Sequence, residues 1–303
     1  MSAQELESLI QMLRTGGPDL AAPLPQARQN FEDMFAAMPI PNDVTFESTT
    51  IGGIPARSSM TPGASKDRVL LYLHGGGYSL GSSLAYRSLF SALARAAGAR
   101  GLAIDYRLAP ENPFPAAVDD ALSAYRGLLE QGTKPGSIAI AGDSAGGGLT
   151  VALLVAAREA GLPMPSAAIA ISPFSDLACT GASTTTKASE DPSLNKDGLL
   201  AMAATYLNGA SPTSPLASPY YANLSGLPPL LIQVGSLEVL LNDATGLAAR
   251  AGEAGVAVQL EVWPGMPHVW HGFAFMLSEG RDAIAAAGAF AAARFHRHMT
   301  AHE

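Results

Sequence analysis

The stretch Gly142 to Gly146, which reads Gly-Asp-Ser-Ala-Gly, places Ser144 between glycines at positions i−2 and i+2. It separates an apolar run that ends at Ala141 from a helix-like run that begins at Leu149. A serine on such a strand-to-helix turn is exposed above a sheet, and the turn is too tight for a Cβ atom at the flanking positions. The pattern predicts that Ser144 is a nucleophile.

A second glycine-rich stretch, His74-Gly75-Gly76-Gly77, directly follows the apolar run from Val69 to Leu73. Three consecutive glycines cost conformational entropy, so an ordinary loop gains nothing from them. They let backbone N–H groups converge on one small space, which is how an oxyanion hole is built. A flexible glycine hinge is the alternative interpretation.

A serine hydroxyl needs a base near neutral pH, and histidine has the matching pKa. Four of the six histidines are set aside, because they belong to the glycine motif or to the polar C-terminal end: His74, His296, His298 and His302. His268 follows a tight Pro-Gly-Met-Pro turn after the last apolar run, and we expect it to be the base. His271 is the alternative, with a supporting or core role. No carboxylate or cysteine stands beside this pair at metal-ligand spacing, so no metal site is expected.

The base needs an acid that fixes its tautomer, in the chain order serine, acid, histidine. The apolar run Leu230 to Val234 is followed by Gly-Ser-Leu and then Glu238, which we expect to be the acid. Asp243 is the competing candidate. It falls inside the next helical stretch, where a solvated or capping role would explain it.

Composition limits the protein classes that remain. The 303 residues are 48% hydrophobic and 15% charged, which excludes a disordered chain. A net charge of −8 disfavours nucleic acid and anionic membrane surfaces as partners. The single cysteine, Cys179, permits no intrachain disulfide, and neither a signal peptide nor a bilayer-spanning run is apparent. We therefore expect a cytoplasmic protein, and we expect no cofactor, because the proposed chemistry needs only proton and acyl transfer.

Short apolar strands alternate with helical stretches over most of the chain. The expected strands cover residues 69–73, 101–105, 138–141, 168–172, 230–234 and 256–263, after an antiparallel pair around residues 44–54. The expected helices cover residues 86–98, 115–130, 145–160, 193–207, 240–254 and 279–298. This alternation predicts an α/β fold with a mostly parallel central sheet and helices on both faces.

Two segments lie outside this alternation. Residues 4–38 show helical spacing interrupted by glycine and proline, which predicts two short helices. Residues 173–215 form a Ser-, Thr- and Pro-rich insertion with one amphipathic helix, which we interpret as a lid. The expected organisation is an N-terminal helical cap segment at 1–42 and a catalytic domain at 43–303 with a cap insertion around 180–212.

Together these motifs resemble the bacterial hormone-sensitive-lipase-like esterases, a branch of the α/β-hydrolases. The resemblance covers roughly residues 40–298 and rests on motifs that occur in the family's order: His74–Gly77, Asp105–Glu111 with Pro113–Ala117, Gly142–Gly147, Leu227–Ile232 and Gly265–His268. The family often has Asp followed by Pro where this chain has Glu238 followed by Val239.

The resemblance implies roles for further residues. The N–H groups of Gly76, Gly77 and Ala145 would form the oxyanion hole, and His74 would brace the glycine loop, with Asp143 in a supporting position. The Asp105–Glu111 segment would be structural. The two helical segments outside the alternation would form the cap over the acyl pocket, and homodimers are common in the family.

The sequence thus predicts a serine carboxylesterase that hydrolyses short- to medium-chain acyl esters through Ser144, His268 and Glu238 and an acyl-enzyme. Its partner would be a small-molecule ester. Another acyl hydrolase, such as a thioesterase, amidase or peptidase, stays open, because all can use the same triad. A ligand-binding protein on a hydrolase scaffold and a true lipase are less favoured, since His268 is present and the insertion is polar.

Overall fold

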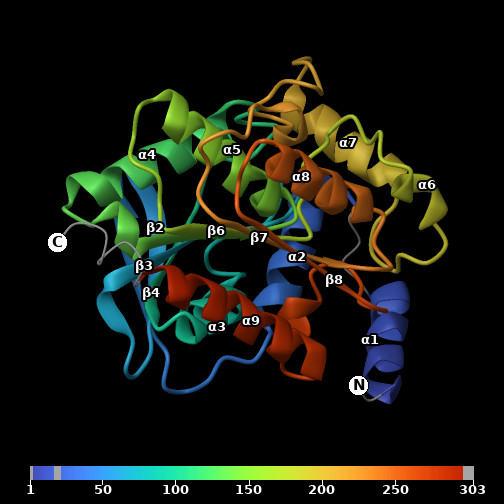
Figure 1. Cartoon of the computed structure of the whole chain (residues 1–303). Coiled ribbons are helices and arrows are strands. Elements are labelled where there is room, and N and C mark those ends of the chain that lie inside the picture. The colour runs from blue at the N-terminus through green and yellow to red at the C-terminus, as the bar shows by residue number, and fades with distance from the viewer. Residues whose placement is uncertain (1–2, 17–21, 296–303) are drawn as a thin grey trace.

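An eight-stranded sheet forms the centre of the computed structural model, which describes residues 3–16 and 22–295 (Figure 1). Its order is β1-β2-β4-β3-β5-β6-β7-β8, and every pairing from β4 to β8 is parallel. The β1–β2 and β2–β4 pairings are antiparallel. The strands are β1 (Thr45–Ile51), β2 (Ile54–Met60), β3 (Ser65–Leu73), β4 (Ala99–Ile104), β5 (Ile138–Asp143), β6 (Ala167–Ile171), β7 (Leu230–Gly235) and β8 (Val258–Trp263). The expected antiparallel pair and mostly parallel sheet are confirmed.

Helices cover both faces of this sheet (Figure 1). Every residue of β5 and β6 is buried, as expected for central parallel strands with helices on both sides. A hydrophobic core lies on each face of the sheet. Successive side chains of β3 point alternately into these two cores, because strand side chains have a period of two. Leu71 and Leu73 pack with α4, α5 and α8, whereas Leu70 and Tyr72 pack with α3 and α9. These helices are α3 (Arg87–Ala96), α4 (Ala116–Glu130), α5 (Ala145–Glu159), α8 (Leu241–Glu253) and α9 (Ser278–Phe295).

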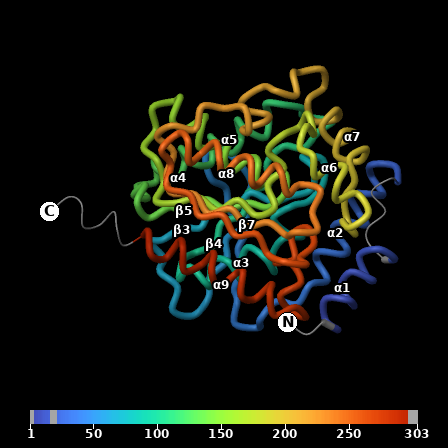
Figure 2. The backbone as a smooth tube through the Cα atoms, turned by 45° about the vertical axis from the view of Figure 1, so that its right-hand side comes forward, coloured from blue at the N-terminus to red at the C-terminus, as the bar shows by residue number. Residues whose placement is uncertain are grey.

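Four helices outside the sheet layers gather on one side of the molecule (Figure 2). The two expected N-terminal helices are α1 (Ala3–Gly16) and α2 (Leu24–Ala36). The other two, α6 (Ser183–Thr186) and α7 (Lys196–Leu207), lie in the insertion between β6 and β7. Three short 3₁₀ helices complete the secondary structure of the described ranges: η1 (Pro135–Ser137), η2 (Pro219–Tyr221) and η3 (Trp270–Phe273).

The N-terminal helices are held by apolar contacts with the chain that follows β8. Leu9 of α1 is fully buried in a small core with Met266, Trp270 and Phe273. Phe31 of α2 packs in the core beneath α3 and α9. Within the described residues, no helix is long and apolar enough to cross a membrane.

Candidate active site

Ser144 lies on the sharp turn between β5 and α5, with a positive φ of 54° and a ψ of −121°. A Cβ atom on Gly142 would come within 2.2 Å of the Gly146 carbonyl oxygen, and one on Gly146 within 2.0 Å of the Leu73 carbonyl oxygen. The backbone therefore tolerates only glycine at both flanking positions. The Ser144 N–H donates to the carbonyl of Ile171 at the end of β6, which fixes the turn above the strand ends.

The glycine loop after β3 contains two N–H groups without a protein acceptor among the described residues, those of Gly76 and Gly77. Gly76 and Gly77 have φ values of 109° and 60°, so both lie in the region that favours glycine. Ala145, the first residue of α5, is fully buried next to the nucleophile, and an N-terminal helix N–H has no partner within its own helix. The fold thus brings these three residues beside the turn that carries Ser144.

Asp143 connects this glycine loop to the turn that carries Ser144. Its carboxylate accepts the Gly75 N–H at 2.9 Å and the hydroxyls of Tyr72 at 2.6 Å and Tyr86 at 3.1 Å. Burial raises the pKa of Asp143 to about 6, although these donors and the nearby His268 oppose the shift. The side chain therefore fixes the first glycine of the loop from beneath.

His74 supports the same loop from its other side. The ring is buried and stacks on Tyr106 with 4.3 Å between ring centroids. Its Nδ1 lies 2.8 Å from the Gly75 carbonyl oxygen, and the Tyr106 hydroxyl donates to the His74 carbonyl at 2.7 Å. Burial lowers the pKa of His74, which favours a neutral ring.

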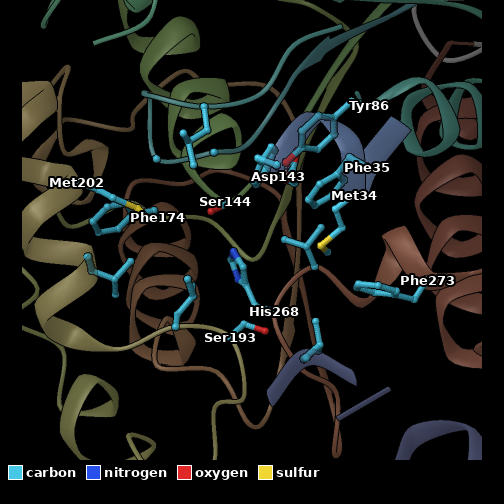
Figure 3. A pocket seen from close by; sticks show the side chains of 18 of the residues that line it. Met34, Phe35, Tyr86, Asp143, Ser144, Phe174, Ser193, Met202, His268 and Phe273 are labelled. Atoms are coloured by element: carbon cyan, nitrogen blue, oxygen red, sulfur yellow. Dashed lines mark hydrogen bonds between the residues drawn. The ribbon is translucent and has the colours of Figure 1, made fainter. Parts of the chain in front are cut away.

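His268 lies between β8 and η3 and points across the cavity toward Ser144 (Figure 3). Its Nδ1 is 2.8 Å from the Glu238 Oε2 atom. A carboxylate can only accept, so Nδ1 donates and Nε2 is left as the basic nitrogen. Burial is the largest single influence and lowers the pKa of His268, but the Glu238 hydrogen bond together with the charges of Glu238, Asp191 and Asp143 outweighs it and raises the pKa.

Glu238 is fully buried just after β7. Its Oε1 atom accepts the Ser172 hydroxyl at 2.7 Å and the Gly235 N–H at 2.6 Å. The Ser172 oxygen also accepts the Val269 N–H at 3.2 Å, so it contacts both the acid and the residue after His268. The sequence analysis did not identify Ser172 as a functional residue, and its one signal was its position at the end of the expected strand 168–172.

Asp243, the competing acid, does not face His268. It is buried in the first turn of α8, where Oδ2 accepts the N–H groups of Ser175 and Asp176 at 2.9 and 2.8 Å. The solvated or capping role suggested for it is wrong, because the side chain fixes the loop after β6. Burial raises its pKa to about 8.

His271 is a core residue, one of the two roles considered for it. Its buried ring lies 2.9 Å from the Gln233 side-chain oxygen through Nε2, and burial lowers its pKa to about 3. The three C-terminal histidines that the sequence set aside, His296, His298 and His302, lie outside the described residues.

The charged groups of the Asp105–Glu111 segment make structural contacts. Asp105 accepts the Ser83 N–H and hydroxyl, and Arg107 pairs with Asp120 at 2.7 Å. Glu111 pairs with Arg28 of α2 at 2.7 Å. The Arg28 guanidinium also donates to the carbonyl oxygens of Ser79 and Ala109, which joins an N-terminal helix to the loop that follows the glycine motif.

Ser144 and His268 line a cavity of about 350 Å³ whose walls are mainly apolar (Figure 3). Its volume is that of a small-molecule site. The N-terminal helices α1 and α2 contribute Leu13, Arg14, Thr15, Phe31, Met34 and Phe35. The insertion contributes Ser193, Leu194, Leu199 and Met202. Within residues 3–16 and 22–295, no group of three or more His, Cys, Asp or Glu side chains is placed to hold a metal ion.

The chain is similar to known proteins in both sequence and fold. Residues 70–272 match the family model described as alpha/beta hydrolase fold. The chain is 57% identical over 229 residues to an acetyl-hydrolase from Streptomyces hygroscopicus, covering 76% of this chain and 77% of the relative. A solved esterase from the bacterial hormone-sensitive lipase family has a TM-score of 0.93 at 49% identity, covering 97% of this chain and 99% of that one.

A further solved relative carries information on substrate. EstE5, in a crystal soaked with p-nitrophenyl butyrate, has a TM-score of 0.93 at 47% identity and covers 97% of this chain and 100% of its own. The same protein has a structure named as its PMSF form.

Proposed function

We propose that Ser144, His268 and Glu238 carry out ester hydrolysis in this chain, which belongs to the bacterial hormone-sensitive-lipase branch of the α/β hydrolase fold family and is a carboxylesterase. The observation that carries the proposal is the contact between Glu238 Oε2 and His268 Nδ1 at 2.8 Å, on a histidine that faces Ser144 across one cavity (Figure 3). This contact leaves Nε2 free to accept the serine proton.

In the proposed reaction, Ser144 Oγ attacks the ester carbonyl while His268 Nε2 takes its proton. The N–H groups of Gly76, Gly77 and Ala145 stabilise the oxyanion of the tetrahedral intermediate. His268 then protonates the departing alcohol, and a water molecule activated by the same nitrogen hydrolyses the acyl-enzyme. Asp143 and His74 act indirectly, by holding the glycine loop in place.

We propose short- to medium-chain acyl esters as substrates. A cavity of about 350 Å³ accommodates an acyl group of this size together with a small alcohol. The p-nitrophenyl butyrate soak of EstE5 and the acetyl-hydrolase relative support the same class. In this proposal residues 1–42 and the insertion around 180–212 form the cap, since described residues from both line the cavity.

A homodimer is a further part of the proposal. Strand β8 lies at the edge of the sheet, and Leu260 and Val262 on it are 38% and 41% exposed. Pairing with a second copy would cover this edge. Sedimentation velocity on the wild type and on a Leu260→Lys variant tests it, and the proposal fails if both sediment as monomers.

The triad is tested by Ser144→Ala with p-nitrophenyl butyrate as substrate. We expect kcat to fall by several orders of magnitude, on the order of 10⁶-fold, because the nucleophile is lost. Substantial residual activity in a folded Ser144→Ala protein would disprove the assignment. Matched ester, thioester and amide substrates with one acyl group then separate a carboxylesterase from the other acyl hydrolases.

A further inference from the structure

Asp191 is a buried carboxylate in the loop between α6 and α7, and it is only 9% exposed. Its Oδ1 atom accepts the N–H groups of Ser193 at 2.9 Å and Leu194 at 3.0 Å. Ser193 and Leu194 both line the cavity that contains Ser144. One carboxylate oxygen of Asp191 therefore holds in place the backbone that forms part of the cavity wall.

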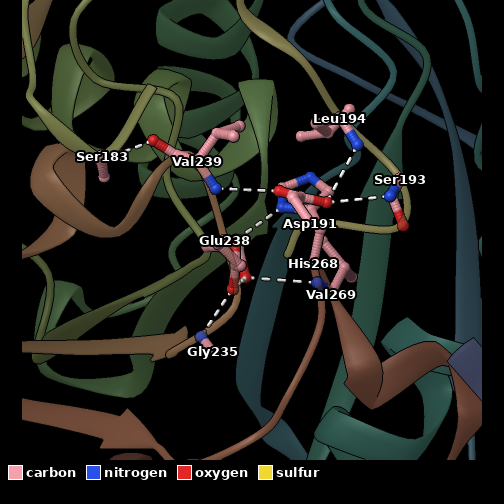
Figure 4. Close-up of polar contacts among 10 residues, drawn as sticks. Ser183, Asp191, Ser193, Leu194, Gly235, Glu238, Val239, His268 and Val269 are labelled. Atoms are coloured by element: carbon pink, nitrogen blue, oxygen red, sulfur yellow. Dashed lines mark hydrogen bonds and ion pairs between the residues drawn. The ribbon is translucent and has the colours of Figure 1, made fainter. Parts of the chain in front are cut away.

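The other oxygen of Asp191 reaches the segment that carries Glu238 (Figure 4). Oδ2 accepts the Val239 N–H at 2.9 Å, across 48 positions in the sequence. The carbonyl of the same Val239 accepts the hydroxyl of Ser183 at 2.6 Å. Both polar backbone groups of the residue directly after Glu238 are thus bound by the insertion between β6 and β7.

The charge of Asp191 has an electrostatic partner only when His268 is protonated. Three N–H groups solvate the buried carboxylate, and no Lys or Arg in the described ranges pairs with it. A buried anion without a cation is costly, so a positive charge that forms nearby is favoured. The positive charge that the proposed reaction creates there is the His268 imidazolium.

The charged and titratable groups around His268 come from several elements. Glu238 follows β7, Asp191 comes from the insertion, and Asp143 ends β5, and all three carboxylates act to raise the pKa of His268. His271 of η3 is buried and has a lowered pKa, so it is neutral. Arg14 of α1 lines the same cavity and is exposed to solvent. The field at the imidazole is therefore dominated by carboxylates.

We propose that Asp191 is a positioning residue of the ester-hydrolysis reaction, which joins the cavity wall at Ser193 and Leu194 to the backbone beside Glu238 and places a further negative charge near His268. The inference rests on the proposed function. Because one carboxylate holds both segments, an acyl group that packs against Leu194 is coupled to the orientation of the acid.

The main test is Asp191→Asn, which preserves size but removes the charge and one acceptor oxygen. With p-nitrophenyl butyrate, we expect kcat to fall by about tenfold, the effect of a shift of one pKa unit in the base. The KM should change by less than about twofold, because an amide oxygen can still accept the Ser193 and Leu194 N–H groups. The acid limb of the pH profile of kcat/KM should move to lower pH, because the variant lacks the negative charge of Asp191 that favours the His268 imidazolium.

Two further variants separate the effects. Asp197→Asn is the matched control, because it removes the same charge from the exposed first turn of α7 and should leave all parameters unchanged. Ser183→Ala releases the Val239 carbonyl without changing any charge. We expect it to lower kcat severalfold while the acid limb stays in place, and it decides the positioning role if Asp191→Asn does not fold.

The proposal is overturned if folded Asp191→Asn keeps the wild-type kcat and acid limb. It is also overturned if this variant only raises KM and lowers the melting temperature with the limb unmoved, because Asp191 would then merely shape the cavity wall. In either case an inactive Ser144→Ala protein would leave the proposed function intact, whereas an active one would refute that function first.

Discussion

Replacing Glu238 by glutamine should reverse the proton arrangement of His268 while keeping the shape of the site. Glu238 Oε1 receives two donors, the Ser172 hydroxyl and the Gly235 N–H. A glutamine must therefore place its oxygen there and turn its NH₂ group toward His268. The NH₂ group would donate to Nδ1, and the ring proton would move to Nε2, the atom that has to accept the proton of Ser144.

The expected loss in kcat follows from the tautomer that the glutamine would impose on His268. A triad acid replaced by its amide lowers kcat on the order of 10⁴-fold when the geometry is otherwise intact. At 1.36 kcal/mol per tenfold change, this corresponds to about 5.5 kcal/mol of lost transition-state stabilisation. The KM should stay nearly constant, because Glu238 is not among the described residues that line the cavity.

Steady-state hydrolysis of p-nitrophenyl butyrate measures kcat and KM, and ¹⁵N NMR of His268 reports its tautomer. The wild type should carry the ring proton on Nδ1 and the Glu238→Gln variant on Nε2. Asp243→Asn is the control, because it changes a buried carboxylate that contacts Ser175 and Asp176 instead of His268. The reasoning is refuted if folded Glu238→Gln keeps more than about a tenth of the wild-type kcat, or if Asp243→Asn is the more damaging change.

Two other predictions concern stability and the oxyanion site. Asp243 has a folded-state pKa of about 8, above the unfolded value, so the folded state binds the proton more tightly and stability falls as pH rises from about 4 to about 8. Asp243→Asn should therefore raise the melting temperature more at pH 8 than at pH 5, and an equal shift at both values, measured by calorimetry, would contradict this. Gly76→Ala would place a Cβ atom 2.4 Å from the Leu80 carbonyl oxygen at a φ of 109°, so the loop must shift. We expect a loss in kcat of about 10²- to 10³-fold, as for a lost oxyanion donor, and wild-type kcat in the folded variant would argue against the proposed hole.

Local sterics explain why the sequence predicted the turn at Ser144 and the glycine loop. At Gly142 and Gly146 the flanking backbone leaves no room for a Cβ atom, so the residue types themselves encode the turn. The alternation of apolar strands and helices likewise predicted the parallel sheet. The ends of several elements differ, as for β8, which begins at Val258 where the pattern placed the start at residue 256. The insertion also contains the short helix α6 in addition to α7, where the pattern predicted a single helix.

The sequence favoured Glu238 but left Asp243 as a competitor, because both follow β7 at positions compatible with a triad acid. The direction of each side chain depends on partners that are remote in the chain. Ser172 holds Glu238 across 66 positions, and Ser175 holds Asp243 across 68. The role of Asp191, which joins the cavity wall to Val239, could not be predicted from the sequence for the same reason.

Thus the amino-acid sequence by itself determined the nucleophile turn, the glycine loop and the class of fold, since these depend on backbone sterics and on the period of apolar residues. The tertiary structure decided which carboxylate meets His268 and which segments hold that carboxylate in place. Those contacts exist only because the ends of neighbouring parallel strands and the insertion between β6 and β7 meet at one edge of the sheet.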